Sequence, residues 1–200
     1  MTMSEPITGA TRNARERILD TAYELFSRNG IRAVGVDRII AESGVAKMTL
    51  YRHFGSKDEL VLEFLRRREQ RWTQEWLQAE VEQRADDPAE RLLAIFDVFD
   101  AWFRTDDFDG CSFINVLLEL TDRASPVRRA TVGHLATIRS FLQRLAADAD
   151  VADPEDFARR WHILMKGSIV AAGEGDREAA RRAQAIGKLL LADARARATS

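Results

Sequence analysis

The chain has 200 residues and a mass of 22.6 kDa, which is enough for one large domain or two small ones. Its 30 Lys and Arg residues against 32 Asp and Glu residues give a formal net charge of -2, which argues against a protein that coats nucleic acid or anionic lipid through bulk charge. The single cysteine, Cys111, excludes an intrachain disulfide and a cysteine-rich zinc site.

The start of the chain and its apolar stretches indicate neither export nor membrane insertion. Residues 1–11 are short and polar, unlike a signal peptide. The longest apolar stretches, 113–120 and 188–192, fall well short of the roughly 20 residues that a membrane span requires. We therefore expect a cytoplasmic protein with no membrane partner.

The first predicted elements are three helices. Apolar residues share one face of a helix from about 12 to 29, which Asn29-Gly30 closes. Two short helices follow, at 36–43 and 46–54, with Gly44-Val45 between them. Gly44 can adopt the positive φ of a tight turn, and Val45 can fill the angle between the helices. This arrangement is typical of a helix-turn-helix.

Capping residues mark the starts of the later helices. Ser56 and Glu59 form a capping box at the head of a helix that begins near residue 57. An Asp or Ser followed by Pro predicts further starts near 88, 126 and 154, and Asp176 predicts a weaker one. Stripes of apolar residues fill these segments and no segment alternates with period two, so we predict an all-α chain of about nine helices.

The second helix of the predicted helix-turn-helix has two distinct faces. Leu50 and Phe54 are four residues apart and point inward together. The other residues of this helix carry two cations, hydroxyl groups and an aromatic ring, the groups that contact phosphates and base edges. We predict DNA contacts from that face and from the start of the next helix, at Lys47, Met48, Thr49, Tyr51, Arg52, His53 and Lys57.

The segment from Gly44 to Leu60, GVAKMTLYRHFGSKDEL, resembles the TetR (tetracycline-repressor-like) family of transcription regulators. The resemblance covers roughly residues 12–62. It implies an N-terminal arm and three-helix DNA-binding domain at 1–55, and a larger helical ligand-binding and dimerisation domain at 56–200. It also implies a homodimer that represses transcription from a palindromic DNA operator and that a small-molecule effector releases.

Two residues depart from the family pattern. Gly35 stands where a Ser or Thr often caps the helix before the turn, so we expect a weaker cap there. Ala46 stands where many members carry Ser, so one hydroxyl that could cap the next helix or contact phosphate is absent.

The charge distribution agrees with a DNA-binding head. Residues 1–71 hold 13 basic and 10 acidic residues, a balance of +3, whereas residues 72–200 hold 17 and 22, a balance of -5. The acidic excess lies in the part that we predict to bind ligand.

Candidate ligand-binding residues are aromatic or polar groups within the apolar C-terminal segments. An apolar cavity needs aromatic walls, and polar groups on an apolar face need a partner. The candidates are Trp102, Phe113, Asn115, Glu119, His134, Trp161, His162 and Met165. The alternatives are core packing for the aromatic rings, and capping or inter-helix hydrogen bonds for the polar groups.

No metal or other cofactor is predicted. Glu119, His134 and His162 are of the right types to coordinate a metal, but they lack ligand spacing and fall on separate helices. Cys111 is either a redox-sensitive thiol or, as we favour, a small residue that packs a helix junction.

Candidate dimer-interface residues lie on the last two long helices, which combine small and large side chains. They are Phe157, Trp161, Leu164, Ser168, Ala183, Ile186 and Leu190. The alternative is that these stripes pack only within one chain.

Two other functions compete with a ligand-released repressor. A helical enzyme would need a nucleophile–base pair or a carboxylate cluster at recognisable spacing, and we find none, so we predict no catalytic residues. A helix-turn-helix regulator without a small-molecule ligand, constitutive or controlled by a partner protein, remains the main alternative.

Overall fold

The computed structural model describes residues 13–106 and 108–198. The N-terminal arm, which we predict at the start of the first domain, lies outside the described residues. The chain divides into two compact units, Met1–Phe64 and Leu65–Ser200, so the division falls within one helix. The predicted boundary between residues 55 and 56 lies at the start of that helix and remains a prediction.

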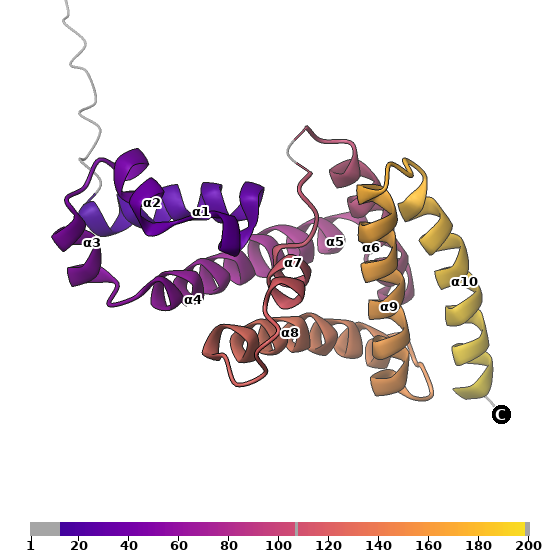
Figure 1. Ribbon diagram of the computed structural model, residues 1–200. Helices are drawn as coiled ribbons and strands as arrows, with labels where there is room; N and C mark the ends of the chain where they lie inside the picture. The colour runs from indigo at the N-terminus through magenta and orange to yellow at the C-terminus, as the bar shows by residue number, and fades with distance from the viewer. Residues whose placement is uncertain (1–12, 107, 199–200) are drawn as a thin grey trace, which may run out of the picture. The chain divides into compact units, whose positions relative to one another are not determined.

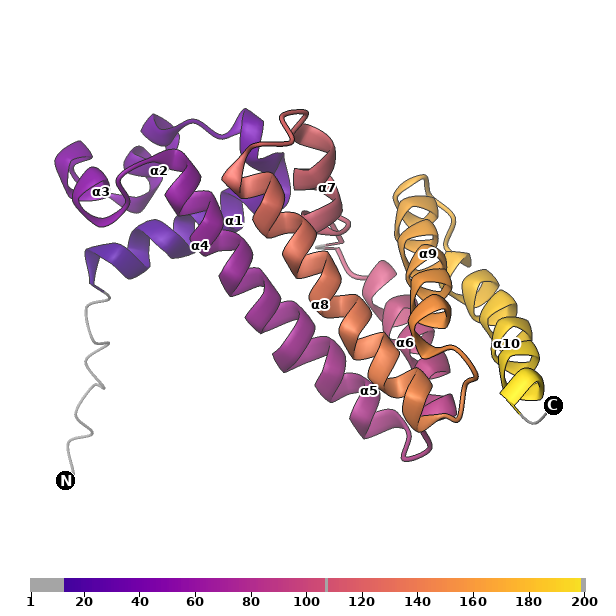
Figure 2. The ribbon, with the colours of Figure 1, turned by 90° about the horizontal axis from the view of Figure 1, so that it is seen from below.

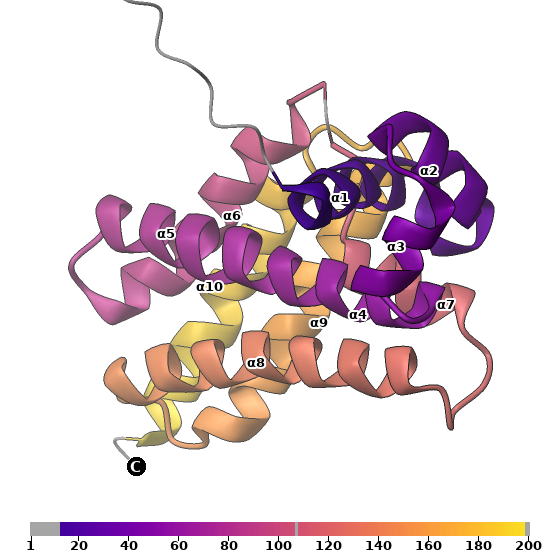
Figure 3. The ribbon, with the colours of Figure 1, turned by 90° about the vertical axis from the view of Figure 1, so that its left-hand side faces the viewer.

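The smaller unit is built on α1 (Ala14–Ala33), α2 (Val36–Ser43), α3 (Lys47–His53) and the first part of α4 (Lys57–Arg68). Figure 3 shows α2 and α3 beside α1. The side chains of Leu19, Ile39 and Leu50 are fully buried, one from each of the first three helices. These residues therefore form a common core that fixes the orientation of α3 on α1.

Backbone geometry confirms the predicted helix-turn-helix. Gly44 has φ 64° and ψ 34°, and its N–H donates to the carbonyl of Ile40 at 3.1 Å, which ends α2. Val45 is buried beside the turn. Gly30 has φ 77° and ψ 165°, so the regular part of α1 ends where the Asn29-Gly30 pair predicts. Neither Gly35 nor Ala46 supplies a side-chain cap, as expected.

One continuous helix runs from Lys57 to Arg84. It comprises α4, the π-helix η1 (Glu69–Gln78) and α5 (Ala79–Arg84). At its head the Ser56 hydroxyl accepts the N–H of Glu59 at 3.1 Å, and the Glu59 carboxylate accepts the N–H of Gly55 at 2.9 Å. The predicted capping box is therefore present.

The larger unit contains the rest of this helix and five more. They are α6 (Pro88–Phe103), α7 (Ser112–Glu119), α8 (Pro126–Asp148), α9 (Pro154–Gly173) and α10 (Ala179–Ala198). Asp87, Ser125 and Asp153 cap α6, α8 and α9, each accepting a backbone N–H three residues ahead. Helices α9 and α10 lie side by side (Figure 1), and α8 runs along η1 and α5 (Figure 2).

The described residues contain no strand, so the all-α prediction is confirmed. With α4, η1 and α5 counted as one, their helices number nine. Across residues 13–106 and 108–198, no helix combines the length and apolarity that a membrane crossing requires.

Candidate DNA-binding and ligand sites

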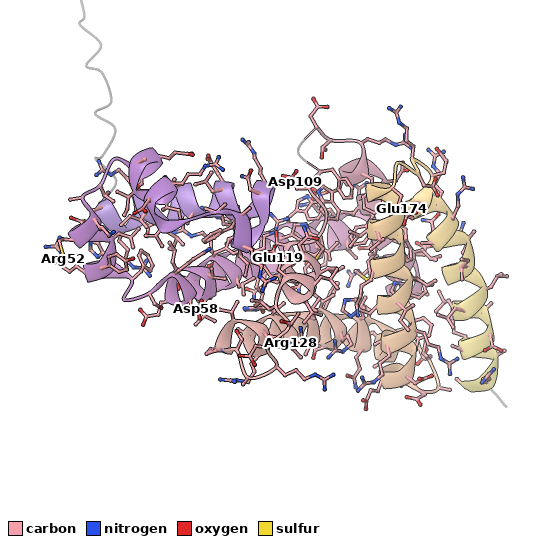
Figure 4. All side chains as sticks on the ribbon, viewed as in Figure 1. Arg52, Asp58, Asp109, Glu119, Arg128 and Glu174 are labelled. Carbon is pink, nitrogen blue, oxygen red and sulfur yellow. The ribbon has the colours of Figure 1, made fainter. Side chains whose placement is uncertain are left out.

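The exposed face of α3 carries the predicted DNA-binding side chains. Leu50 and Phe54 are 0% and 3% exposed, so the inward face is as predicted. Of the predicted contact residues, Lys47, Met48, Tyr51, Arg52 and His53 are exposed, whereas Thr49 and Lys57 are half-buried. Figure 4 shows Arg52 projecting outward from this helix.

Contacts within the smaller unit hold α3 in place. The Arg15 guanidinium of α1 lies 5.2 Å from the centroid of the Phe54 ring, at the end of α3, and bonds the Glu63 carboxylate of α4 at 3.1 Å. The rings of Tyr23 and Phe26 each lie 5.5 Å from the ring of Phe64. These contacts link the C-terminal end of α3 and the middle of α4 to α1.

One acidic neighbour was not expected on this face. The Lys47 ammonium lies 3.7 Å from the Asp37 carboxylate of α2, and both side chains are well exposed. An exposed pair of this kind contributes at most about 1 kcal/mol, so a phosphate can displace the carboxylate at little cost.

The structure separates the predicted ligand-binding residues into three places. The first is a junction of α7, α8 and η1, where the Phe113 ring stacks on His134 with centroids 5.3 Å apart. The His134 Nδ1 atom contacts the Glu69 carboxylate. Sequence reasoning missed Glu69, because an acid on a long charged helix gives no sign of its partner 65 residues ahead. Figure 4 labels Glu119 and Arg128 in this part of the unit.

Two polar candidates on α7 differ in their surroundings. Asn115 is exposed, and its amide donates to the carbonyl of Asp109 at 3.2 Å. It therefore fixes the loop before α7, which is the capping alternative raised by the sequence. Glu119 is half-buried. Within the described residues, no group of three acidic, histidine or cysteine side chains is placed to hold a metal ion.

The second place is the packed core between α6, α9 and α10. Trp161 is fully buried, 5.2 Å from the Phe157 ring and 5.4 Å from the Phe96 ring. Met165 and His162 are also buried. Burial lowers the pKa of His162 to about 3, and the positive charges of Lys166 and Arg139 act in the same direction.

Cys111 lies at the start of α7 and is 5% exposed. Burial raises the pKa of its thiol. A protonated, buried thiol is a weak nucleophile, which agrees with the packing role over the redox role.

The third place is a cleft of about 370 Å³ that Trp102 lines. It lies between α6 and the stripe of the long helix that includes Trp72 and Trp76. The sequence shows the signal for this wall, since residues 68, 72, 76, 80 and 84 repeat at the i, i+4 spacing of one helix face.

The predicted dimer-interface residues fall into two groups. Phe157, Trp161, Ser168 and Ala183 are buried within the single chain, whereas Leu164 and Leu190 are half-buried and Ile186 is exposed. The large apolar side chains that α9 and α10 expose to solvent are Ile163, Val170, Ile186 and Leu189, at 50–74% exposure. These four side chains are accessible on the surface of the larger unit.

Two family models match the chain. Residues 18–64 match the model described as bacterial regulatory proteins of the tetR family, and residues 88–186 match the tetracyclin repressor-like C-terminal domain. The HTH-type transcriptional regulator LmrA of Bacillus subtilis is 32% identical over 120 residues. That match spans 59% of this chain and 63% of LmrA, so it covers less than two thirds of the relative.

Solved structures match over almost the whole chain. SCO4454, a TetR-family transcriptional regulator from Streptomyces coelicolor, has a TM-score of 0.81 and 29% identity, and the match covers 93% of this chain and 92% of SCO4454. The transcriptional regulator sav143 from Streptomyces avermitilis has a TM-score of 0.80 and 30% identity, with coverage of 92% and 98%. These relatives are named as regulators, which agrees with the expectation that the chain is not an enzyme. The helix-turn-helix, the all-helical second unit and these matches together place the chain in the TetR family of DNA-binding transcriptional regulators.

Proposed function

We propose that this protein represses transcription by binding a palindromic DNA operator as a homodimer, and that a small, partly apolar molecule bound in the larger unit releases it. The observation that carries the proposal is the face of α3. Five of its seven residues are exposed on a helix whose inward residue, Leu50, is fully buried. A rigidly seated helix with exposed cations suits the major groove.

The short length of α3 supports a homodimer. A helix of seven residues contacts too few base pairs to select one site in a genome, whereas two copies related by a two-fold axis read both halves of a palindrome. Exposed Ile163, Val170, Ile186 and Leu189 on two adjacent helices support an interface there, because monomers rarely expose such groups together.

Release by a ligand is supported by the cleft in the larger unit. Its volume of about 370 Å³ suits a small molecule, which favours a ligand-responsive regulator over one without a ligand. The long helix begins with Lys57 and carries the cleft residues Trp72 and Trp76. A ligand that prefers one tilt of this helix would shift the dimer away from the spacing of successive major grooves, about 34–36 Å.

The test is selection of bound duplexes from a random pool, followed by affinity measurements on the selected sequence. Replacing both Tyr51 and Lys57 with Ala removes two predicted contacts from each subunit. We expect binding to weaken at least about 100-fold, because such contacts are worth about 1–3 kcal/mol each. Arg144→Ala removes one cation from α8 and serves as the control, with affinity unchanged. Wild-type affinity in the double variant, with circular dichroism showing an intact fold, would refute the assignment of α3.

A further inference from the structure

The cleft in the larger unit has a regular wall. On the long helix its lining residues repeat every fourth position, as Arg68, Trp72, Trp76, Glu80 and Arg84. Trp102 of α6 also lines the cleft. Because residues four apart lie on one helix face, the stripe forms a nearly straight wall with aromatic rings in its middle and charges toward its ends.

The middle of the wall is a cluster of three indoles. Ring centroids lie 5.4 Å apart for Trp72 and Trp76, 5.4 Å for Trp72 and Trp102, and 5.9 Å for Trp76 and Trp102. The rings touch one another, so no ligand fits between them. Trp72 is 8% exposed, whereas Trp76 and Trp102 are half-buried and present ring surface to the cleft. The planes of these two rings are inclined at 67°, so a flat aromatic ligand can stack on one of them and meet the other edge-to-face.

The wall is also built on irregular backbone. Trp72 and Trp76 lie in the π-helix Glu69–Gln78, whereas π-helical structure is usually confined to a single turn and is frequent at functional sites. Glu69, its first residue, contacts His134 of α8. A long π-helix is maintained only where packing favours it, and here it carries two of the three indoles.

The charges decide which kind of aromatic ligand fits. Indole faces alone attract cations. Here, however, two guanidinium groups, Arg68 and Arg84, line the cleft with one carboxylate, Glu80. Arg84 Nη2 bonds the Glu80 carboxylate at 3.0 Å, so this carboxylate is already paired and offers a cationic ligand little attraction. A guanidinium has five N–H donors, and the Glu80 bond uses one of them, so Arg84 can also bind a ligand carboxylate.

We propose that the cleft binds planar polycyclic aromatic carboxylates, with the rings stacked on one of Trp76 and Trp102 and edge-to-face with the other, and with the carboxylate bonded to Arg84. Arg84 is eight residues from Trp76, about 12 Å along the helix axis. The acid group therefore lies at one end of the long axis of the ligand. A role for such a ligand in releasing DNA rests on the proposed function, whereas its binding does not.

The binding test uses three anthracene derivatives that differ only in the group at position 2: a carboxylate, a carboxamide and a protonated aminomethyl group. Three of the four tryptophans line the cleft, so quenching of tryptophan emission reports binding. We expect saturable quenching by the carboxylate, with an affinity at least about 10-fold above that of either analogue. Equal or tighter binding of the cation, or no saturable quenching by the carboxylate, would overturn the proposal.

Variants locate the site. Arg84→Gln should weaken carboxylate binding about 10-fold while the carboxamide binds as before, and Trp76→Leu should weaken both. Arg144→Gln on α8 is the matched control and should change neither affinity. Carboxylate binding that survives both cleft variants would place the ligand elsewhere and sink the assignment.

The same probe separates this inference from the proposed function. Titration of the carboxylate into the complex with the selected duplex tests release of DNA. Binding without release supports the cleft and refutes the effector role of such acids. Failure of the probe to bind the protein leaves the DNA-binding result untouched and refutes the cleft.

Discussion

His162 of α9 is a buried imidazole in positive surroundings. It is 3% exposed, and its Nδ1 atom has no hydrogen-bond partner among the described residues. The charged groups that act on it are Lys166, one turn along α9, and Arg139 of α8. Because burial lowers the pKa of His162 to about 3, the imidazole is neutral in the native state over the whole range in which an ordinary histidine titrates.

We therefore predict that the protein loses stability in mild acid through this residue. In the unfolded state His162 takes up a proton near pH 6.5, whereas in the native state it does so only near pH 3. The free energy of unfolding therefore falls as the pH drops below 6.5. Between pH 7 and pH 5 the loss from His162 is about 2 kcal/mol. Urea unfolding of the wild type and of His162→Gln at both pH values isolates this contribution. An equal pH dependence in the two proteins would contradict the prediction.

At the scale of single residues, the sequence predicts orientation better than partners. Leu50 and Phe54 are buried as their spacing predicts, because helix geometry alone decides which side chains share a face. The contact between Lys47 and Asp37 depends on the angle between two helices, which spacing along one helix does not reveal. Asn115, predicted as a ligand contact, is exposed and bonds its own loop.

Among the helices, α10 packs against α9 and α6 through a position that has no side chain. A Cβ atom added at Gly187 would lie 2.8 Å from Cη2 of Trp161 and 3.4 Å from Cε2 of Phe96. The indole of Trp161 thus lies directly on the backbone of α10. Small residues beside large ones on these helices predict a packing seam, and for Trp161 and Gly187 that seam lies within one chain.

We predict opposite effects from two glycine substitutions in helices. Gly187→Ala should lower the free energy of unfolding by about 1–2 kcal/mol, because overpacking against a rigid indole costs more than the roughly 1 kcal/mol gained in helix propensity. Gly133→Ala in α8 should raise it by about 0.5–1 kcal/mol, since nothing lies within 4 Å of the added Cβ. Denaturant unfolding measures both, and a stabilised Gly187→Ala variant would show that α10 packs differently.

Helix starts were predictable because local chemistry determines them. Asp87, Ser125 and Asp153 each precede Pro, and each caps its helix through its own side chain. The π-helical segment Glu69–Gln78 was not predictable. Trp72 and Trp76 of this segment contact Trp102 of α6, and such tertiary contacts cannot be seen in the local sequence.

At the scale of the whole molecule, the sequence predicts the fold class but not which apolar residues the folded chain leaves exposed. An apolar stripe at helical spacing has the same appearance whether it is buried in its own chain or against a partner. Phe157 and Ala183 are buried in the chain itself, and Ile186 is exposed. Because Phe157 and Ala183 are already buried, we propose the exposed residues Ile163, Val170 and Leu189, together with Ile186, as the dimer interface.

If the exposed side chains of α9 and α10 form the dimer interface, one charge placed among them should prevent dimerisation. Leu189 is 74% exposed on α10, so Leu189→Asp leaves the core of the chain unchanged while it places a carboxylate in the proposed interface, where its desolvation is costly. Sedimentation should show monomers for this variant and dimers for the wild type. Leu118→Asp on α7, at 75% exposure, introduces the same charge on another helix and should remain dimeric. Because one α3 contacts only half of a palindrome, the monomeric variant should also bind the selected duplex far more weakly. If Leu189→Asp remained a dimer, the interface would have to lie away from α10.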